Sequence, residues 1–365
     1  MTYRAWQVKQ PDEQAAARLA NAIGAPLLLA RILVARGMSS PEQAMEFLEQ
    51  DAPLSDPFLM RDMDKAVQRI LQAVDEEQPI VIFGDYDVDG VTATALLYSH
   101  LRGMGANVRC KLPSREEDGY GLTNAIVEQL AEKGYKLIIT VDNGITAIPE
   151  ARRARELGVD LVITDHHLPG EELPDAVAVV DPARKDDESP CKTLSGAGVA
   201  FKLCAALDGC EPEMLLDFCG DLAAIGTVAD VMVLQGENRT IVKHGLYALQ
   251  NSERPGLLAL LEACGLGDRP VTSESISFAI APRLNAAGRM DSAVSALQLL
   301  LCEDEGRAQQ LTDQLVASNT ARQEAEQRIM AEAEAQLAAD PARQNDRVIL
   351  VWGQDYHPGV IGIVA

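Results

Sequence analysis

The stretch Val81-Ile82-Phe83-Gly84-Asp85-Tyr86-Asp87-Val88-Asp89-Gly90 decides how the rest of the sequence is interpreted. A short apolar run ends at three carboxylates that alternate with other residues and are followed by a glycine. In an extended or tightly turned segment, this spacing lets all three carboxylates reach one point. Carboxylates gathered so closely repel each other unless a cation neutralises them. The stretch therefore predicts a metal site at the end of a strand.

Short β-branched runs and helical patterns alternate around this stretch. Apolar runs predict strands at residues 80–83, 107–112, 136–141, 161–164 and 176–180, and 3.6-residue periodicity predicts helices at 64–74, 92–103, 124–133 and 149–157. Continuous apolar strands that alternate with helices are typical of a parallel sheet covered on both faces. We therefore expect an α/β fold with a parallel-sheet core flanked by helices.

Polar side chains follow most of the predicted strands. Besides the first stretch, the strand ends carry Asp142-Asn143-Gly144, Asp165-His166-His167 and Asp181-Pro182. In an open α/β sheet, ligands bind beyond the carboxyl ends of the strands. We therefore expect these acidic and imidazole groups to converge on one edge of the sheet and form a site.

The types of these side chains indicate which metal the site would hold. Adjacent side chains diverge in an extended turn, so at most one of His166 and His167 would bind a metal, and the other would be free for substrate or proton transfer. Taken alone, the histidine pair could be structural and Asp142 could be a turn residue. Many oxygen ligands with one imidazole and no thiolate suit Mn²⁺ or Mg²⁺ better than zinc. The number of candidates favours two ions, an arrangement that hydrolyses phosphoesters.

Two familiar binding loops do not fit the first stretch, each because of specific residues. A calcium-binding EF-hand needs a helix before its loop and a glutamate at the twelfth position, but here a strand precedes the loop and that position is Leu96. A dinucleotide-binding loop needs Gly-x-Gly-x-x-Gly, which the sequence lacks.

Composition excludes several classes of protein. The 365 residues are 47% hydrophobic and 24% charged, as in ordinary soluble globular proteins. The net charge of −23 argues against a general basic coat for nucleic acid, although a local groove could still be positive. The sequence has no signal-peptide pattern and no apolar stretch of membrane-spanning length. Seven cysteines without any Cys-x-x-Cys pair predict a reduced, cytoplasmic protein.

The pattern changes along the chain predict five segments. They are an N-terminal helical segment at 1–60, an α/β domain at 61–240, a helical extension of that domain at 241–303, a long connecting helix at 304–340, and the start of a truncated second domain at 341–365. Residues 347–352 are expected to begin a new strand. Because the chain stops in mid-pattern, we expect it to be a fragment of a longer protein.

Four stretches resemble, in order, the motifs of the DHH phosphoesterase superfamily. They are Gly84 to Gly90, Val141 to Gly144, Asp165 to His167, and Gly226 to Asp230. Within this superfamily, the chain resembles the RecJ-like family of bacterial single-strand-specific 5′→3′ DNA exonucleases. Further stretches similar to that family are Leu112 to Arg115, Leu194 to Ala200, Pro282 to Met290 and His357 to Ala365. The segment at 341–365 would then begin a DHHA1-like domain.

The resemblance implies roles for the residues at matching positions. The metal ligands would be Asp87, Asp89, Asp142, His166 and Asp230, with Asp142 bridging two ions. Asp85 would be a catalytic residue, either a metal ligand itself or an acid hydrogen-bonded to a ligand, and His167, also catalytic, would contact the scissile phosphate. Some superfamily members have a metal-binding histidine where this sequence has Phe83, which leaves the coordination of one ion open.

The resemblance also implies residues that bind the substrate. Arg115 would hold the 5′ end of the DNA, unless it is a surface arginine paired with Glu116. Arg283, Asn285 and Arg289 would contact the DNA backbone. Ser195 is expected to shape a backbone turn rather than to act as a nucleophile, because no partner base is apparent.

The activity implied by the resemblance is metal-dependent hydrolysis of single-stranded DNA to 5′-mononucleotides, in recombination and repair. The implied partners are single-stranded DNA, a single-strand-binding protein and a RecQ-type helicase. One alternative is a phosphodiesterase of the same superfamily acting on nanoRNA, cyclic dinucleotides or pyrophosphate. Another is a non-catalytic replication scaffold of the same fold that has lost its metals.

Overall fold

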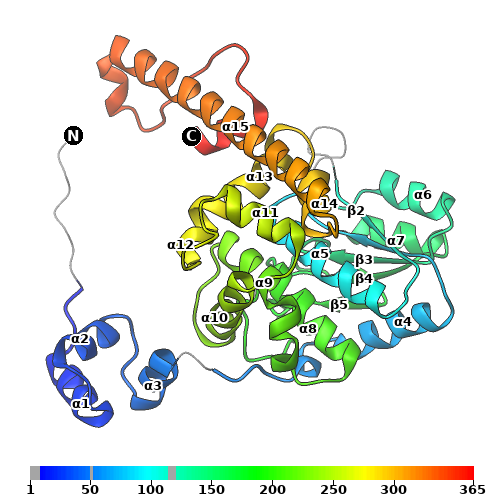
Figure 1. Ribbon diagram of the computed structural model, residues 1–365, viewed down its shortest axis with the longest axis horizontal. Coiled ribbons are helices and arrows are strands. Elements are labelled where there is room, and N and C mark those ends of the chain that lie inside the picture. Colours follow the sequence, from blue (N-terminus) through cyan, green and yellow to red (C-terminus); the bar gives the residue numbers. More distant parts are fainter. Residues whose placement is uncertain (1–8, 50–51, 114–120) are drawn as a thin grey trace.

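A five-stranded parallel sheet lies at the centre of the protein. The computed structural model describes residues 9–49, 52–113 and 121–365 (Figure 1). The strands are β1 (Ile80–Phe83), β2 (Val108–Lys111), β3 (Leu137–Val141), β4 (Asp160–Thr164) and β5 (Ala178–Val180), in the order β2-β1-β3-β4-β5. The strand order reverses between β1 and β3, and ligands bind at such a switch point in open α/β sheets. The predicted parallel-sheet fold is confirmed.

Alternate residues of each strand enter cores on opposite faces of the sheet. On one face, Ile80 and Ile82 pack with three helices, α4 (Met63–Asp75), α5 (Val88–Gly103) and α8 (Gly196–Asp208). On the other face, Val81 and Phe83 pack with α6 (Asn124–Glu132) and α7 (Ile148–Glu156). Strands buried on both faces need apolar residues at every position, which explains the continuous apolar runs of the sequence.

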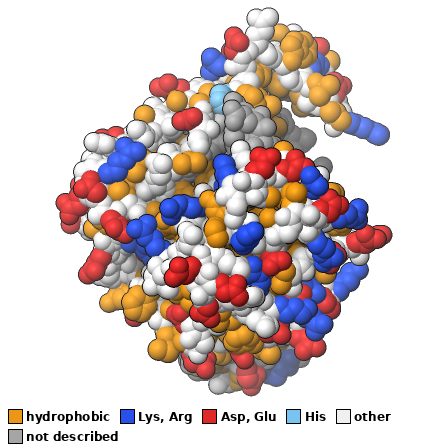
Figure 2. Space-filling model, turned by 90° about the vertical axis from the view of Figure 1, so that its right-hand side faces the viewer, with side chains coloured by type: hydrophobic (Ala, Val, Ile, Leu, Met, Phe, Trp, Pro, Cys, Tyr) orange, Lys and Arg blue, Asp and Glu red, His pale blue; other side chains and the backbone are white. Residues whose placement is uncertain are grey.

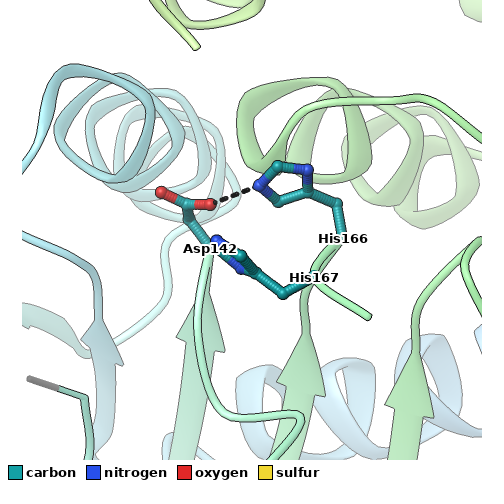
Figure 3. Close-up of side chains that lie close together, drawn as sticks. All are labelled: Asp142, His166 and His167. Atoms are coloured by element: carbon teal, nitrogen blue, oxygen red, sulfur yellow. Dashed lines mark ion pairs between the residues drawn. The ribbon is translucent and has the colours of Figure 1, made fainter. Parts of the chain in front are cut away.

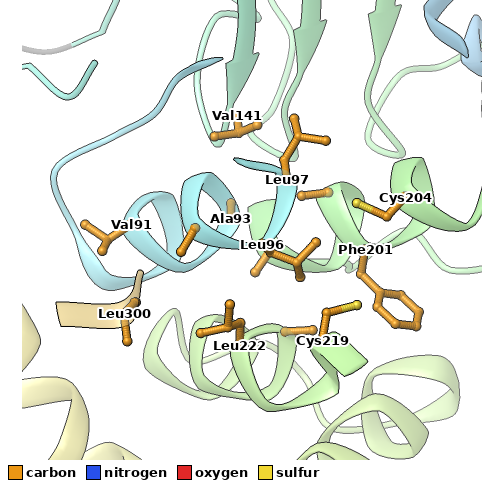
Figure 4. Close-up of a cluster of buried hydrophobic side chains, with 14 of the residues drawn as sticks. Val91, Ala93, Leu96, Leu97, Val141, Phe201, Cys204, Cys219, Leu222 and Leu300 are labelled. Atoms are coloured by element: carbon orange, nitrogen blue, oxygen red, sulfur yellow. The ribbon is translucent and has the colours of Figure 1, made fainter. Parts of the chain in front are cut away.

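Helix α5 is enclosed on all sides from Val88 to Leu97. It lies between the sheet, α8 and α9 (Leu216–Ala229), and its Leu96 and Leu97 side chains are 1% and 0% exposed (Figure 4). A helix buried all round carries apolar or small residues on every face. Because α5 begins directly after the first acidic motif, the core holds that motif in a fixed position.

The second half of the chain is helical and shares the core of the sheet. It contains η2 (Pro212–Leu215), α10 (Gly236–Gln250), α11 (Pro255–Ala263), α12 (Ser273–Ser275), the π-helical turn η3 (Ile276–Ile280), α13 (Ala281–Met290), α14 (Val294–Leu300) and α15 (Glu305–Ala339). Leu311 and Leu315 of α15 are buried in this core, whereas the later turns of α15 extend away from it (Figure 1). A long helix at the predicted position is confirmed, and its role as a connection between domains stays a prediction.

The N-terminal helices form a small core of their own. Helices α1 (Glu13–Ile23), α2 (Leu27–Ala35) and α3 (Pro41–Glu49) bury Leu19 and Leu33 against one another. After this unit the chain passes through Ser55 and η1 (Pro57–Leu59) to α4. Ser55 donates to the Glu237 carboxylate at 2.7 Å, and the buried Lys202 ammonium lies 2.6 Å from the same carboxylate. This buried group attaches the connecting segment to α8 and α10.

The predicted strand at 347–352 is wrong. These residues form no strand; they follow η4 (Pro341–Asn345) and precede α16 (Pro358–Val364). Val348, Leu350 and Trp352 are 71%, 68% and 69% exposed. A strand forms only where it can pair with another strand, and no such partner lies beside this segment in the described part of the chain.

Two observations concern the helices and the charge of the described surface. Among the helices that the structure describes, none is long and apolar enough to cross a membrane. Acidic and basic side chains are intermixed on the face shown in Figure 2. The net charge of −23 is therefore not gathered into one acidic surface on that face.

Candidate metal centre

The first acidic motif forms a turn that leads from β1 into α5. Asp85 is 3% exposed and accepts a hydrogen bond from the Tyr86 backbone N–H at 2.7 Å. Asp87 caps α5 by accepting from Gly90 N–H at 3.0 Å. Asp89 already lies in the first turn of α5. The helix thus begins at Val88, four residues before the predicted start, because Asp87 supplies the cap.

Asp89 is held by the N-terminus of a second helix. Its two carboxylate oxygens accept from the backbone N–H groups of Gly196 and Ala197, at 2.6 and 2.9 Å. These N–H groups belong to the first turn of α8, where a helix offers unpaired donors to an anion. Ser195 caps α8 by accepting from Gly198 N–H, so the expectation that Ser195 shapes the backbone is confirmed.

Asp142 follows β3 in an uncommon backbone conformation. Its φ is +61°, in the left-handed region that few residues other than glycine adopt. The neighbouring Asn143 amide donates to the Phe83 and Val141 carbonyls and so joins the ends of β1 and β3. A Cβ atom on Gly196 would lie 2.7 Å from Asp142 Oδ1, so only glycine allows α8 to approach this closely.

The two histidines after β4 lie with their ring centres 4.4 Å apart, both near Asp142, but they have different partners (Figure 3). His166 is nearly buried, and its Nε2 lies 3.0 Å from Asp142 Oδ1 (Figure 3), 3.6 Å from Asp230 Oδ2 and 3.8 Å from Asp89 Oδ2. His167 is 46% exposed, and its Nδ1 lies 2.7 Å from Asp165 Oδ1. His166 therefore belongs to the carboxylate cluster, whereas His167 is held beside it by Asp165.

The cluster divides into overlapping groups that could each hold a cation. Asp85, Asp87 and Asp142 place one ligand atom each within 4.8 Å of one another, and so do Asp89, His166 and Asp230. A third group consists of Asp142, His166 and His167. Since Asp142 belongs to the first group and lies 3.0 Å from His166 of the second, its carboxylate stands between the two groups.

Three carboxylates of the cluster have raised pKa values, as expected for acids that need a nearby positive charge to ionise. Burial, then repulsion from Asp87, raises the pKa of Asp89 to about 8. Burial, then repulsion from Asp89, raises the pKa of Asp142 well above its ordinary value. Burial, followed by repulsion from Asp87, also raises the pKa of Asp230 to about 6. These carboxylates would ionise fully only beside a cation.

His166 also has the properties of a metal ligand. Burial and then the nearby His167 lower the pKa of His166 to about 4, so the imidazole is neutral and its nitrogen lone pair can coordinate. His166 Nε2 and Asp142 Oδ1 are both buried and neither makes a hydrogen bond, although they lie 3.0 Å apart. Buried polar atoms normally have a partner. The residues therefore fit a divalent cation.

His167 carries a positive charge, opposite to that of ionised carboxylates. The hydrogen bond to Asp165 raises the pKa of His167 to about 9, so the ring is an imidazolium at neutral pH. Burial raises the pKa of Asp165, but the hydrogen bond and charge of His167, together with the backbone N–H groups of Ile145 and His167, outweigh it and the pKa is lowered. The pair thus presents a half-exposed cation at the edge of an acidic cluster.

The predicted substrate-binding residues lie partly outside this cluster. Arg115 is outside the described residues. Arg283 donates to the Ala279 carbonyl at 2.7 Å, and its buried Nε makes no hydrogen bond. Arg289 donates to the Gly359 carbonyl at 3.1 Å, and Asn285 is half-buried.

These three residues share α13, which lies against the first motif. A Cβ atom on Gly288 of α13 would lie 2.6 Å from the Tyr86 carbonyl oxygen. The helix therefore packs closely against the backbone of the turn that carries the first motif. The DNA contacts of Arg283, Asn285 and Arg289 stay predictions.

Several residues that build the cluster were missed by the sequence reasoning. Asp165 was quoted only as part of a motif, yet it holds His167 and accepts from Ile145 N–H at 2.9 Å. Gly226 was also quoted without a role, yet a Cβ there would lie 2.6 Å from Thr92 Oγ1 and against Asp89. The sequence feature that could have revealed them is their position, because both lie within the motifs that end at His167 and Asp230.

The family match and the similar proteins agree with each other. Residues 79–227 match the family described as "DHH family, N-terminal domain". The chain is 41% identical over 361 residues to the single-stranded-DNA-specific exonuclease RecJ of Bacillus subtilis, covering 99% of this chain and 45% of the relative. The chain thus spans less than half the length of that protein.

Solved structures of similar fold contain metal ions. RecJ from Thermus thermophilus in complex with Mn²⁺ superposes with a TM-score of 0.83 at 34% identity, covering 98% of this chain and 51% of that one. An exonuclease RecJ bound to manganese gives a TM-score of 0.76 at 39% identity, covering 86% of this chain and 78% of that one.

Proposed function

Because this chain belongs to the RecJ family of the DHH superfamily, we propose that it is the catalytic part of a metal-dependent exonuclease that degrades single-stranded DNA. The reaction is hydrolysis of phosphodiester bonds from the 5′ end, giving 5′-mononucleotides in recombination and repair. The observation that carries the proposal is the pair of acidic groups that meet at Asp142. Two adjacent groups of this kind are what a two-metal phosphodiesterase requires.

The residues divide naturally between two Mn²⁺ or Mg²⁺ ions. Asp85, Asp87 and Asp142 would hold one ion, and Asp89, His166 and Asp230 would hold the other, with Asp142 bridging. Asp85 would then be a ligand of the first ion. Some superfamily members have a metal-binding histidine at the position of Phe83, and this chain lacks it. Oxygen ligands with one imidazole are the donor set of such cations, and relatives crystallised with Mn²⁺ and Mg²⁺ support it.

The protein's own groups would prepare the substrate for attack. When bound, the ions supply an activated water and neutralise charge on the phosphate. The His167 imidazolium, fixed by Asp165, would donate a hydrogen bond to a non-bridging phosphate oxygen. The N-terminus of α8 keeps Asp89 in place through two N–H groups, so the ligand does not reorganise during the reaction.

The strand of DNA would reach the cluster along α13. Arg283 has an unpaired, buried Nε, and arginine is the favoured clamp for phosphate. Arg283, Asn285 and Arg289 would contact the DNA backbone, and Arg115 would bind the 5′ end. The close approach of Gly288 to Tyr86 supports a path that leads from this helix to the metal centre.

The test removes single ligands and measures two properties. Asp142→Ala and Asp89→Ala are compared with the unchanged chain in Mn²⁺ binding by calorimetry and in hydrolysis of 5′-labelled single strands. We expect both properties to fall by more than about 100-fold, since even groups that only orient metal ligands cost about 10–100-fold. Asp175→Ala, on the exposed loop before β5, is the control. Full hydrolysis in either ligand variant would refute the assignment.

The two alternative functions are less well supported. The named relatives are exonucleases for single-stranded DNA, which does not favour nanoRNA, cyclic dinucleotides or pyrophosphate as substrates. A scaffold without metals does not need buried carboxylates of raised pKa around a neutral imidazole. Competition between a long oligonucleotide and di- to pentanucleotides separates the first alternative, and Mn²⁺ calorimetry separates the second.

The remaining assignments follow from the family role. We place the protein in the cytoplasm, with a single-strand-binding protein and a RecQ-type helicase as partners. We also divide the chain at about residues 60, 240, 303 and 340, with residues 341–365 opening a DHHA1-like domain. The separate core of α1–α3 supports the first of these boundaries.

A further inference from the structure

A small cavity lies between the N-terminal helices and the rest of the chain, away from the metal centre. Its volume is about 200 Å³, and it is lined from one side by Arg36 and Phe47 and from the other by Gln235, Gly236 and Arg239. Ligand pockets for whole drug-sized molecules occupy about 300–1,000 Å³. This cavity is therefore large enough for a small ion, or for one chemical group of a larger ligand.

Two arginines face the cavity without an acidic partner among the residues that the structure describes. The guanidinium carbons of Arg239 and Arg36 lie 4.1 and 5.8 Å from the centre of the Phe47 ring. Within the described part of the chain, neither arginine forms an ion pair, and the buried Nε of Arg239 makes no hydrogen bond. Because both guanidinium carbons lie close to the same ring centre, the distance between the two positive charges is no larger than about one Debye screening length at 0.1 M salt. The two cations repel each other unless an anion lies between them.

The acidic residues near the cavity do not supply that anion. Glu46 lines the cavity but is exposed and pairs with neither arginine. Glu237, in the first turn of α10, is turned away, because its carboxylate binds the Lys202 ammonium at 2.6 Å and the Ser55 hydroxyl at 2.7 Å. No described acidic side chain therefore pairs with this positive charge, in a chain whose net charge is −23.

The start of α10 adds donors to the same cavity. Gln235 precedes the helix without a side-chain cap, and Gly236 has a φ of +51°. The first N–H groups of a helix have no intrahelical acceptor and favour a bound anion. Two unpaired guanidinium groups and the uncapped N-terminus of a helix of 15 residues meet in one small cavity.

We propose that this cavity is an anion site that binds a phosphate group through Arg36, Arg239 and the N-terminus of α10. Arginine binds phosphate with paired, charge-assisted hydrogen bonds. Phe47 holds both guanidinium groups by cation–π contact and so fixes them for the ligand. A bound phosphate contacts both α1–α3 and α10 and therefore links the N-terminal unit to the sheet domain.

The test measures phosphate binding in the metal-free chain, so it does not depend on hydrolysis. Melting temperature and calorimetry are recorded with inorganic phosphate and with chloride at equal ionic strength, in the presence of a chelator. Phosphate should raise the melting temperature of the unchanged chain, and chloride should not. Arg36→Gln should weaken binding at least tenfold, and Arg36→Gln with Arg239→Gln should abolish it.

Controls separate the site from general charge effects. Arg152→Gln removes the same charge from the exposed side of α7 and should leave phosphate binding unchanged. Arg36 is exposed, so its single variant should fold normally even if the double variant does not. Equal phosphate binding in the unchanged chain and in Arg36→Gln, or equal shifts with phosphate and chloride, would overturn the proposal.

A second arm identifies the source of the phosphate. Oligo(dT) of six nucleotides is titrated into the same metal-free proteins. Tighter binding than inorganic phosphate that is lost in the double variant assigns the site to a nucleic-acid backbone. Oligonucleotide binding that is unaffected by the variants, together with phosphate binding that is lost, assigns it to free phosphate.

Discussion

At the scale of single residues, the pairing of Asp165 with His167 determines the charge beside the cluster. Asp165→Asn removes the carboxylate that accepts from Nδ1, so the pKa of His167 should fall from about 9 towards its ordinary value. Titration of the imidazole by NMR measures this directly. Asp175→Asn, whose acid pairs with Arg155 on the surface, is the control. An unchanged pKa in Asp165→Asn would show that the pair does not set the charge.

The same pair has a defined effect on stability. Because its folded-state pKa is raised from 6.5 to about 9, His167 stabilises the folded chain fully below pH 6.5. This stabilisation is lost as the pH rises through 9. The loss should be absent in Asp165→Asn.

The buried carboxylates predict a pH dependence of metal binding. Burial raises the pKa of Asp89 from 3.8 to about 8, so Asp89 stabilises the metal-free fold fully below pH 3.8 and this contribution is lost as the pH rises through 8. A cation offsets the charge, so Mn²⁺ should raise the melting temperature more at pH 8 than at pH 6. Calorimetry at both pH values checks this, and Asp89→Asn should reduce the difference. Equal Mn²⁺ shifts at both pH values would contradict it.

Most residues of the cluster could be predicted from the sequence, because their type and position after strands are visible there. Asp85, Asp87, Asp89, Asp142 and His166 meet as expected. The sequence does not reveal the left-handed backbone at Asp142 or the support of Asp89 by Gly196 N–H. The second depends on the approach of α8, which comes from a segment far along the chain.

At the scale of elements, glycines set how closely helices approach the cluster. A methyl group at Gly226 of α9 would overlap Asp89 and lie 2.6 Å from Thr92 Oγ1. Gly226→Ala should therefore cost about 1–3 kcal/mol of unfolding free energy and weaken Mn²⁺ binding. Gly103→Ala, at the open end of α5, meets nothing within 4 Å and should leave both properties intact. Denaturant unfolding and calorimetry compare the two variants.

The buried ion pair of Lys202 with Glu237 predicts a large effect from a single change. Lys202→Met leaves the Glu237 carboxylate buried beside Ser55 without a cation. The cost should be about 3–5 kcal/mol of unfolding free energy, measured by urea unfolding. Adding Glu237→Leu should recover much of that loss. If the single variant were as stable as the unchanged chain, the pair would not anchor this segment.

Element boundaries were less predictable than element types. All five strands of the sheet occur where the apolar runs predict them, since burial on both faces demands such runs. The first turn of α5 was missed because Asp89 and Gly90 there suggest a loop. The Asp87 cap begins the helix at Val88 instead. The strand at 347–352 failed because pairing, not composition, decides whether a strand forms.

At the scale of the whole molecule, α15 joins two regions of different burial. Leu315 is fully buried in the core of the sheet domain, whereas Met330, four turns later, is 40% exposed. Leu315→Ala should cost about 2–5 kcal/mol of unfolding free energy, and Met330→Ala about 0.5 kcal/mol. Urea unfolding followed by circular dichroism measures both. Equal losses would mean that the whole helix belongs to one cooperative core.

The position of Asp230 has a consequence for the chain during its synthesis. This carboxylate ends α9 and completes the group that begins with Asp89. A polypeptide still growing on the ribosome therefore carries the first acids long before it carries the last. An interrupted product that stops short of residue 230 therefore cannot complete the group of Asp89, His166 and Asp230.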